Sequence, residues 1–453
     1  MKVIIVGAGE LGRLLASTLL EGQHDVVLLD NSGEELERAG EKLDILTVEG
    51  SCASVAALKK AGIDSAHALL AVSGNEPANI LACHIASKLG VANTICRLYD
   101  SSSFSEQDHI GPDSLGIWRT VSPAEECADM ICDVLDNSIL LENIRFSRPH
   151  ARMALIEITR SSQLAGVACK DISVSEQLLK EIRFAAILRG SNMIVPHGET
   201  IFAPGDKVYV AGLDSSIDNF LGLFSPSAEN RTKRLVVTGS EGTGLILARR
   251  AAAKGYDVRF IEPDRKRSES LPSELPEGVL TLHGNPTAED VLEEAGISSA
   301  DVFASLSQDN EDNILSCILA KRMGARKVVC LTHKPEYIRI VPTMEMIDCG
   351  LSATLVSVNA ILRHLETGTM HVDAILQRFR ARLSEYRISP RSPLCGRKLQ
   401  DCKLPPSLVL ALIFRGQEVL IPSGGTVLNS GDVAVAIVTD EGLREIRPLF
   451  PER

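Results

Sequence analysis

Aromatic residues are scarce in this 453-residue chain, and the scarcity limits what the protein can bind. They make up 4% of the sequence, and Trp118 is the only tryptophan. Single-stranded nucleic acids are held on stacked aromatic side chains, which this composition does not supply. The formal net charge of -12 also disfavours nucleic acids, because their phosphate backbones are bound by basic surfaces. We therefore expect no DNA or RNA partner.

Long apolar runs are missing as well, although 45% of the residues are hydrophobic. No 18 consecutive residues are apolar, so the sequence predicts no transmembrane helix. The chain enters a strand pattern at once, without the charged leader and apolar core of a signal peptide. These features predict a cytoplasmic protein, and the chain length suggests three or four domains.

The eleven cysteines show no metal-binding spacing. None forms a CxxC pair, and the closest two, Cys127 and Cys132, have no histidine cluster beside them. Zinc sites use two tight pairs of ligands, so we expect scattered buried thiols and no metal site. Free thiols in this number indicate a reducing compartment.

The chain repeats itself at a spacing of about 230 residues. VIIVGAGELG at 3–12 matches LVVTGSEGTG at 235–244, with an offset of 232 (239 minus 7). VSGNEPANILAC at 72–83 matches LSQDNEDNILSC at 306–317. Further on, LRGSNMIVPHGETIFAPGD matches FRGQEVLIPSGGTVLNSGD. Because the matched blocks keep the same order, we infer an internal duplication.

Each copy has two parts. In the first part, strands such as VIIVG, VVLLD and ALLAVS alternate with helical patterns, which predicts a doubly wound parallel sheet. The second part has short alternating strands and a Gly-Asp turn, which predicts a small α+β module. The expected fold class is therefore α/β, with two Rossmann domains, each followed by a small α+β module. The four parts are predicted at 1–135, 140–225, 232–366 and 372–453, with linkers near 136–150, 225–233 and 366–372.

The sequence GAGELG at 7–12 follows a predicted strand and opens a predicted helix, which is the context of a dinucleotide-binding loop. Gly7 permits the tight turn, Gly9 lets the backbone approach a pyrophosphate, and Gly12 lets helix and strand pack closely. The free N–H groups of the helix start would bind the phosphates. Asp30 ends the next strand and is expected to accept hydrogen bonds from the adenosine ribose, which favours NAD(H) over NADP(H). The alternatives are a purely structural turn and a strand-end aspartate.

Three further residues are candidates for the same edge of the sheet. Ser73 and Gly74 follow the fourth predicted strand, where such sheets bind ligands. Arg97 follows the next predicted strand, TIC, and its side chain could reach a phosphate. Each of the three fits a structural role equally well.

The second copy departs from this pattern. Gly239 and Gly244 hold the outer glycine positions, but Glu241 replaces the middle glycine, and Leu331 stands where the first copy has Arg97. A carboxylate beside two phosphate charges repels them. We therefore expect this second site to bind NAD(H) far more weakly or not at all. Its doubtful ligand set is Gly239, Ser240, Glu241, Gly242, Gly244 and Glu262.

A helical pattern lies between the two parts of each copy. In the second copy it carries a stripe of apolar residues that includes Leu355 and Leu362, and the first copy has a similar stripe with Ile131 and Leu135. Such a stripe either packs on its own domain or is a face offered to another subunit.

An NAD-dependent oxidoreductase is the alternative function. The ten histidines are scattered, and no paired His and Asp stands at a strand end. A dehydrogenase of this build also needs a domain that encloses its substrate, and the modules of about 80 residues are too small for that. We therefore predict a protein that is not an enzyme and has no catalytic residues.

Together these motifs resemble the regulator-of-potassium-conductance family, in which an RCK-N domain is followed by an RCK-C module. The resemblance covers nearly the whole chain, and the tandem arrangement is similar to the peripheral subunits of Trk potassium-uptake systems. The motifs that carry it are GAGELG with Asp30, VSGNEPAN, KLG at 88–90, Arg97, the APGD turn and AKRMGARKV at 320–328.

The resemblance implies a regulatory subunit on the cytoplasmic face of the cell membrane, where nucleotide binding gates an integral membrane potassium transporter of the TrkH or TrkG type. It also implies dimer contacts through the crossover helices and a homotetrameric ring. Related single-unit subunits carry an arginine for ATP at the position of Glu10, so NAD(H) is favoured, with ATP or ADP as the other candidates. The implied first ligand set is Gly7, Ala8, Gly9, Glu10, Leu11, Asp30, Ser73, Gly74 and Arg97.

Overall fold

The computed structural model describes most of the chain. The described residues are 1–22, 24–99, 104, 111–137, 139–146, 150–190, 192–224, 232–334, 337, 341, 344, 346–365, 370–376, 381–439 and 441–451. Two of the expected linkers, at 225–233 and 366–372, therefore lie largely outside the described residues. Within the described residues, no helix is both long enough and apolar enough to span a bilayer.

The first half begins with a six-stranded parallel sheet in the order β3-β2-β1-β4-β5-β6. The inner strands β1 and β4 are buried on both faces, as their continuous apolar runs predict. Its strands are β1 (Lys2–Val6), β2 (Asp25–Asp30), β3 (Leu46–Glu49), β4 (Ala68–Ala71), β5 (Asn93–Arg97) and β6 (Arg119–Val121). The flanking helices are α1 (Glu10–Glu21), α2 (Gly33–Gly40), α3 (Val55–Lys60) and α4 (Glu76–Lys88).

The second half repeats this sheet with the same strand order, β14-β13-β12-β15-β16-β17. Its strands are β12 (Arg234–Thr238), β13 (Asp257–Glu262), β14 (Leu280–His283), β15 (Val302–Ser305), β16 (Lys327–Thr332) and β17 (Cys349–Ser352). Its helices are α8 (Thr243–Ala253), α9 (Arg265–Ser270), α10 (Glu289–Glu294) and α11 (Asn310–Arg322). The order is that of a doubly wound Rossmann sheet, so the predicted fold class and duplication are confirmed.

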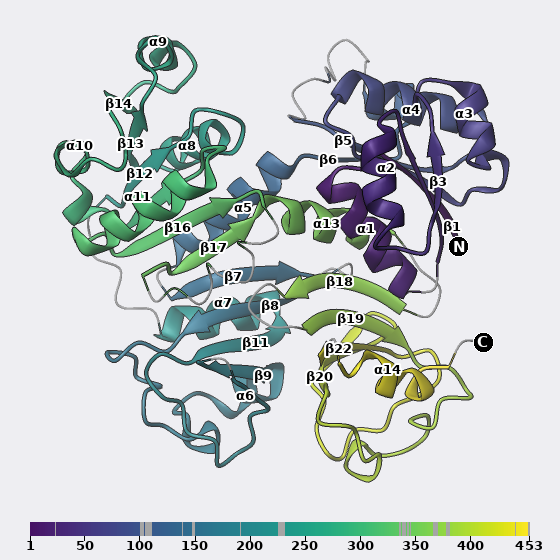
Figure 1. Cartoon of the computed structure of the whole chain (residues 1–453). Helices are drawn as coiled ribbons and strands as arrows, with labels where there is room; N and C mark the ends of the chain where they lie inside the picture. The colour runs from purple at the N-terminus through teal and green to yellow at the C-terminus, as the bar shows by residue number, and fades with distance from the viewer. Residues whose placement is uncertain are drawn as a thin grey trace.

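A five-stranded antiparallel module follows each Rossmann domain, and the two modules lie together below the Rossmann domains in Figure 1. The first contains β7 (Leu140–Arg145), β8 (Ala151–Glu157), β9 (Ile182–Arg189), β10 (Asn192–Ile194) and β11 (Lys207–Leu213), with α6 (Glu176–Glu181) and α7 (Asp214–Phe224). The second contains β18 (Met370–Leu376), β19 (Ala381–Arg387), β20 (Leu408–Arg415), β21 (Glu418–Leu420) and β22 (Val433–Thr439), with α14 (Leu443–Ile446). Side chains of both modules form one shared apolar core.

The Gly-Asp turn of each module is held by an ion pair between a buried aspartate and a partly exposed arginine. Asp206 is fully buried and accepts two hydrogen bonds of 2.7 Å from Arg189. Asp432 pairs in the same way with Arg415, at 3.0 and 2.8 Å. The matched sequence blocks thus keep an interaction that fixes β9 and β20 to the turns before β11 and β22.

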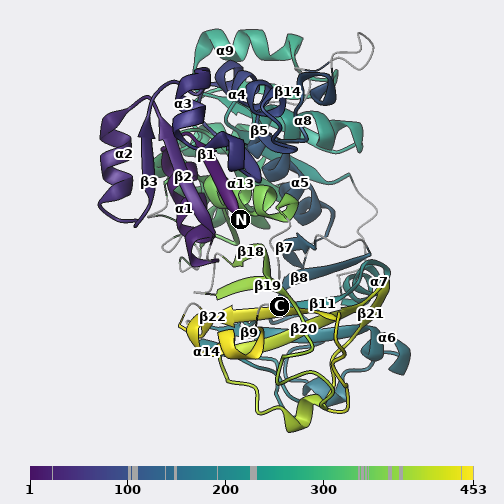
Figure 2. The same ribbon diagram turned by 90° about the vertical axis from the view of Figure 1, so that its right-hand side faces the viewer.

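The two crossover helices exchange partners between the halves. Helix α5 (Pro123–Asp136) packs on α8 of the second Rossmann domain, and α13 (Ala353–His364) packs on α1 of the first. Arg250 on α8 also pairs with Asp129 on α5 at 2.6 Å. Figures 1 and 2 show both helices at the centre of the molecule, above the modules.

This exchange differs from both readings of the apolar stripes. Most residues of each stripe are covered by the other half of the same chain. The stripes therefore pack mainly within the chain, across its two halves. The dimer contact implied by the resemblance is, in this chain, a contact between its own two halves.

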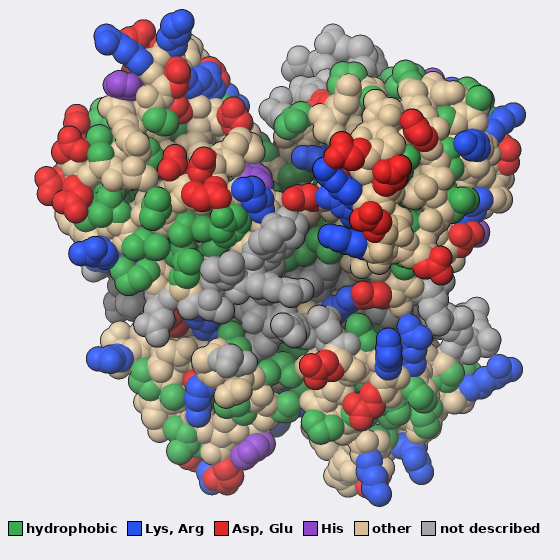
Figure 3. Space-filling model, viewed as in Figure 1, with side chains coloured by type: hydrophobic (Ala, Val, Ile, Leu, Met, Phe, Trp, Pro, Cys, Tyr) green, Lys and Arg blue, Asp and Glu red, His purple; other side chains and the backbone are tan. Residues whose placement is uncertain are grey.

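On the face shown in Figure 3, a furrow separates the two upper lobes, the two Rossmann domains.

Candidate functional site

The loop after β1 makes a turn that only glycine can make. Gly7 has a φ of 108°, and a Cβ atom there would lie 2.8 Å from the backbone of Ser73. A Cβ atom on Gly12 would lie 1.8 Å from the carbonyl oxygen of Gly7. Both positions therefore exclude a side chain: Gly7 because of its positive φ and its approach to Ser73, and Gly12 because helix α1 packs directly on the end of β1.

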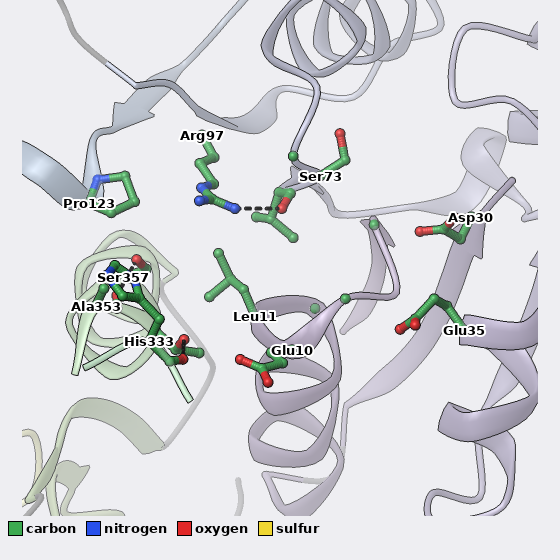
Figure 4. A pocket seen from close by; sticks show the side chains of 16 residues that line it. Glu10, Leu11, Asp30, Glu35, Ser73, Arg97, Pro123, His333, Ala353 and Ser357 are labelled. Carbon is green, nitrogen blue, oxygen red and sulfur yellow. Dashed lines mark hydrogen bonds between the residues drawn. The ribbon is translucent and has the colours of Figure 1, made fainter. Parts of the chain in front are cut away.

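Gly9 has a different environment, since a Cβ atom there would meet no protein atom within 4 Å. It faces a cavity of about 450 Å³, within the range of small-molecule sites. Figure 4 shows Asp30 and Glu35 at one end of this cavity and Arg97, Pro123 and the start of α13 at the other. The lining residues are Gly7, Gly9, Glu10, Leu11, Gly12, Asp30, Glu35, Val72, Ser73, Gly74, Arg97, Pro123, His333, Ala353, Thr354 and Ser357. Every residue predicted for the first site, except Ala8, is among them.

Asp30 holds the loop as well as facing the cavity. Its Oδ2 accepts a hydrogen bond of 2.6 Å from the N–H of Ala8, and its Oδ1 accepts one of 2.8 Å from Ser32. The N–H of Ala8 is thereby committed to Asp30 and is not available to a phosphate. Each carboxylate oxygen keeps a second lone pair for a ribose hydroxyl.

A second support of the loop was missed at the sequence level. Arg13 on α1 donates to the carbonyl oxygen of Ala8 at 2.8 Å and forms an ion pair with Glu35 on α2. Glu35 lines the cavity beside Asp30. Arg13 and Glu35 lie outside the glycine motif, so the spacing of the motif did not predict their role.

Asn79 joins the ends of β4 and β5 at the cavity. Its side chain accepts from the N–H of Ser73 at 3.0 Å and donates to the carbonyl oxygens of Ser73 and Arg97 at 3.0 and 3.1 Å. Asn313 makes the equivalent bonds to Ser307 and Leu331 in the second half. The repeated asparagine therefore fixes this edge of both sheets.

Arg97 supplies positive charge to the cavity. Burial lowers the pKa of its guanidinium, and its Nη1 makes only a long contact of 3.5 Å to the carbonyl oxygen of Val72. No carboxylate of the described residues lies within ion-pair distance of it. A half-buried cation that pairs with no described carboxylate suits an anionic ligand.

The second half of the chain contributes four residues to the far end of the cavity. Ala353, Thr354 and Ser357 come from the first turns of α13, and His333 follows β16. Sequence reasoning missed all four, because they lie more than 200 residues from the glycine loop. They reach it only through the exchange of crossover helices.

The second loop has the same turn, with Gly239 at a φ of 101° and Gly244 against the carbonyl oxygen of Gly239. Its surroundings differ. Arg267 on α9 donates to the carbonyl oxygen of Ser240 at 3.1 Å and forms an ion pair with Glu274. Glu274 is the first cause of the raised pKa of Arg267.

The remaining residues of the second set are also placed. Glu262 is buried and accepts a hydrogen bond of 2.9 Å from the N–H of Asp264. Glu241 is exposed, and a Cβ atom on Gly242 would touch Ala124 at 3.2 Å. Leu331 is buried, so it brings no charge to the position that Arg97 holds in the first half.

Comparison with known structures gives the same fold. The chain aligns with the crystal structure of the GsuK RCK domain at a TM-score of 0.60 and 15% identity, covering 98% of this chain and 93% of that one. It aligns with the GsuK channel bound to NAD at a TM-score of 0.61 and 16% identity, covering 98% and 78%. At such identities the likeness concerns the fold alone.

Sequence comparison covers the whole length. The Trk system potassium uptake protein TrkA of Haemophilus influenzae is 29% identical over 458 residues, 99% of this chain and 98% of the relative. TrkA homolog 1 of Methanosarcina mazei is 28% identical over 465 residues, 99% and 100% of the two chains. The TrkA-N domain matches residues 3–114 and 235–348, and the TrkA-C domain matches 153–225 and 383–450. Because these matches span most of the sequence in the order N, C, N, C, the chain belongs to the TrkA family.

Proposed function

We propose that this chain is a cytoplasmic regulatory subunit that binds NAD(H) in its first Rossmann domain and gates an integral membrane potassium transporter of the TrkH or TrkG type. The observation that carries the proposal is the cavity on the first glycine loop, with Asp30 at one end and Arg97 at the other. The relatives named above are potassium uptake proteins, and one protein of the same fold is described as a channel bound to NAD.

The residues of the cavity fit a dinucleotide. The open space at Gly9 admits a pyrophosphate. The first residues of α1 line this cavity, and the first N–H groups of a helix have no helical acceptors, so they would bind the phosphates. Asp30 would accept hydrogen bonds from the adenosine ribose, and Arg97 would neutralise phosphate charge. Glu10 starts α1, and its carboxylate would repel the third phosphate of ATP, so ATP is a weaker candidate than NAD(H). ADP, which has only the two phosphates of a dinucleotide, is the other candidate.

The proposal extends to the assembly. The division into 1–135, 140–225, 232–366 and 372–453 keeps each crossover helix with the Rossmann domain that precedes it in the chain. We propose a homotetrameric ring on the inner face of the cell membrane. Because the crossover helices are exchanged between the two halves of one chain, a single chain is the unit from which such a ring is built.

One experiment separates a sensor from an oxidoreductase. NADH is titrated into the full-length protein, and its absorbance is then followed with 2-oxo acids and imines. We expect saturable binding without oxidation of the cofactor. Turnover at ordinary enzyme rates, about 1 per second or faster, would establish the oxidoreductase instead. Co-purification from membranes, followed by mass spectrometry, tests for the transporter.

A further inference from the structure

His333 belongs to the second half of the chain but lines the cavity of the first. It follows directly after Thr332, the last residue of β16, at the carboxyl edge of the second Rossmann sheet. The first turns of α13 line the cavity beside it. A ligand in this cavity therefore meets both halves of the molecule.

The second half holds His333 by three hydrogen bonds. Its N–H donates to Oδ1 of Asn310 at 2.6 Å, and its carbonyl oxygen accepts from the hydroxyl of Thr354 at 3.1 Å. Its ring Nε2 lies 3.2 Å from the carbonyl oxygen of Ser307. Because a carbonyl oxygen only accepts, Nε2 must carry the hydrogen of this bond.

The other ring nitrogen is left as an acceptor. Burial lowers the pKa of His333; the charge of Arg97 lowers it further, while Glu241 and the bond to Ser307 act in the opposite direction. The net shift is downward, so at neutral pH the ring is uncharged and Nδ1 carries a lone pair. No described residue is hydrogen-bonded to this Nδ1.

The position of His333 identifies which part of a ligand it would meet. In Figure 4, Asp30 stands at one end of the cavity, the glycine loop in the middle, and the start of α13 at the far end. A dinucleotide with its adenosine ribose at Asp30 and its pyrophosphate on the loop extends its second nucleoside toward that far end. That nucleoside carries hydrogen-bond donors, namely the ribose hydroxyls and the carboxamide NH₂ of nicotinamide.

We propose that Nδ1 of His333 accepts a hydrogen bond from the second nucleoside of a dinucleotide bound in the first Rossmann domain. This inference rests on the proposed function, and it adds a specificity residue from the other half of the chain. A mononucleotide lacks the second nucleoside and gains nothing from His333. A bound dinucleotide joins the two Rossmann domains directly.

The test compares two ligands and two variants of the full-length protein. His333→Gln keeps an N–H for the carbonyl oxygen of Ser307; its one acceptor, the amide oxygen, is bonded to Cδ and does not take the ring position of Nδ1. His283→Gln, at an exposed histidine on β14, is the matched control. NADH is titrated by calorimetry, and ADP is measured as its competitor. We expect His333→Gln to lower the affinity for NADH about three- to tenfold, as loss of one neutral hydrogen bond does, and to leave the affinity for ADP unchanged. The control should leave both affinities unchanged.

Three outcomes would overturn the inference. Equal weakening of NADH and ADP would mean that His333 supports the shape of the site and not the second nucleoside. Unchanged NADH affinity would remove His333 from the site, while the proposed function would stand. Absence of NADH binding to the wild type would overturn the proposed function, and this inference with it. If His333→Gln melts at a lower temperature than the wild type, His333→Phe, which keeps an aromatic ring without nitrogen, replaces it in the same titrations.

Discussion

A methyl group on Gly12 would lie 1.8 Å from the carbonyl oxygen of Gly7, whereas one on Gly9 would meet no protein atom within 4 Å. The two positions of one motif are therefore restricted for different reasons. Gly12 is fixed by the packing of α1 against the strand, and Gly9 borders the space that a ligand would fill. Variants can separate these effects.

We expect Gly9→Glu to fold normally and to bind NADH much more weakly. The new carboxylate repels a phosphate charge at 4 Å by about 1 kcal/mol in water and about 4 kcal/mol at an effective dielectric of 20, so affinity falls about fivefold at the lower value and several hundredfold at the higher one. Calorimetry and thermal unfolding measure the two properties. Gly12→Ala is the control, and it should lower the melting temperature because its methyl group collides with backbone. A Gly9→Glu protein with wild-type NADH affinity would show that the ligand lies elsewhere.

Asp30→Ala should lower the affinity for NADH and reduce the difference in affinity between NADH and NADPH. Each charge-assisted hydrogen bond to the ribose is worth about 1.5–3 kcal/mol, and the carboxylate would repel a 2′-phosphate. The variant should also have a lower melting temperature, because the N–H groups of Ala8 and Ser32 lose their acceptors. Asp30→Asn keeps one of these acceptors, so its melting temperature should lie between those of Asp30→Ala and the wild type. Calorimetry with both cofactors gives the affinities, and an unchanged NADH affinity would exclude Asp30 from the site.

Local spacing predicted the residues of the glycine loop, but not their supports. Asp30 was expected to bind ribose, and the structure adds that it braces Ala8 and Ser32. Arg13 and Glu35 support the loop from outside the motif. Such bonds depend on how the loop closes in space, which no spacing rule describes.

Among the elements, the crossover helices carry the largest difference between expectation and structure. The apolar stripe of α13 was predicted, but its partner was not, because periodicity shows only that a face must be covered. Leu362 on that stripe is 3% exposed and belongs to the core of the first Rossmann domain. The interface is thus part of the fold of a single chain.

Leu362→Glu should therefore destabilise the chain itself. Removing a buried leucine costs about 2–5 kcal/mol, and burying a carboxyl group adds to that loss. Urea unfolding measures the change in free energy. Leu315→Glu on α11 is the control, since Leu315 is 57% exposed and should tolerate the change. If Leu362→Glu kept full stability and light scattering showed a smaller assembly, the stripe would be a contact between chains.

A buried lysine links β16 to the first module and makes stability depend on pH. Nζ of Lys327 donates to the carbonyl oxygens of Leu140 and Asn137 at 2.7 and 3.3 Å, and burial lowers its pKa from 10.5 to about 8. Between these two pKa values the unfolded chain binds more protons than the folded one. The contribution of Lys327 to stability therefore rises with pH over that window, by at most about 1.4 kcal/mol per pH unit.

Lys327→Met should remove this dependence. We expect the free energy of unfolding of the wild type, measured relative to the variant, to increase from pH 8 to pH 10. Taking the difference cancels the thiols and tyrosines that titrate in both proteins. A constant difference across this range would mean that Lys327 keeps its ordinary pKa in the folded protein.

For the whole molecule, the duplication was the most informative feature of the sequence. It predicted two Rossmann sheets and two antiparallel modules, because matched strand and turn patterns must fold alike. It did not predict how the halves interlock, since α5 and α8 lie more than 100 residues apart and their contact leaves no local pattern. His333 entered the first site by the same route, through the packing of one half on the other.

The two halves share a fold but differ in the groups that would hold a dinucleotide, and this predicts one NADH per chain. In the first half, Gly9 leaves open space and Arg97 brings a cation to the cavity. In the second, Glu241 and the buried Leu331 take these two positions, and Arg267 lies on the carbonyl oxygen of Ser240. Calorimetry should thus give a stoichiometry near one. Arg97→Leu, which copies the second half into the first, should weaken NADH by more than tenfold, because a charge-assisted contact of about 1.5–3 kcal/mol is lost. Two equivalent sites in the wild type, or an Arg97→Leu protein that binds normally, would contradict the assignment, because each half would then bind without the groups that distinguish the first.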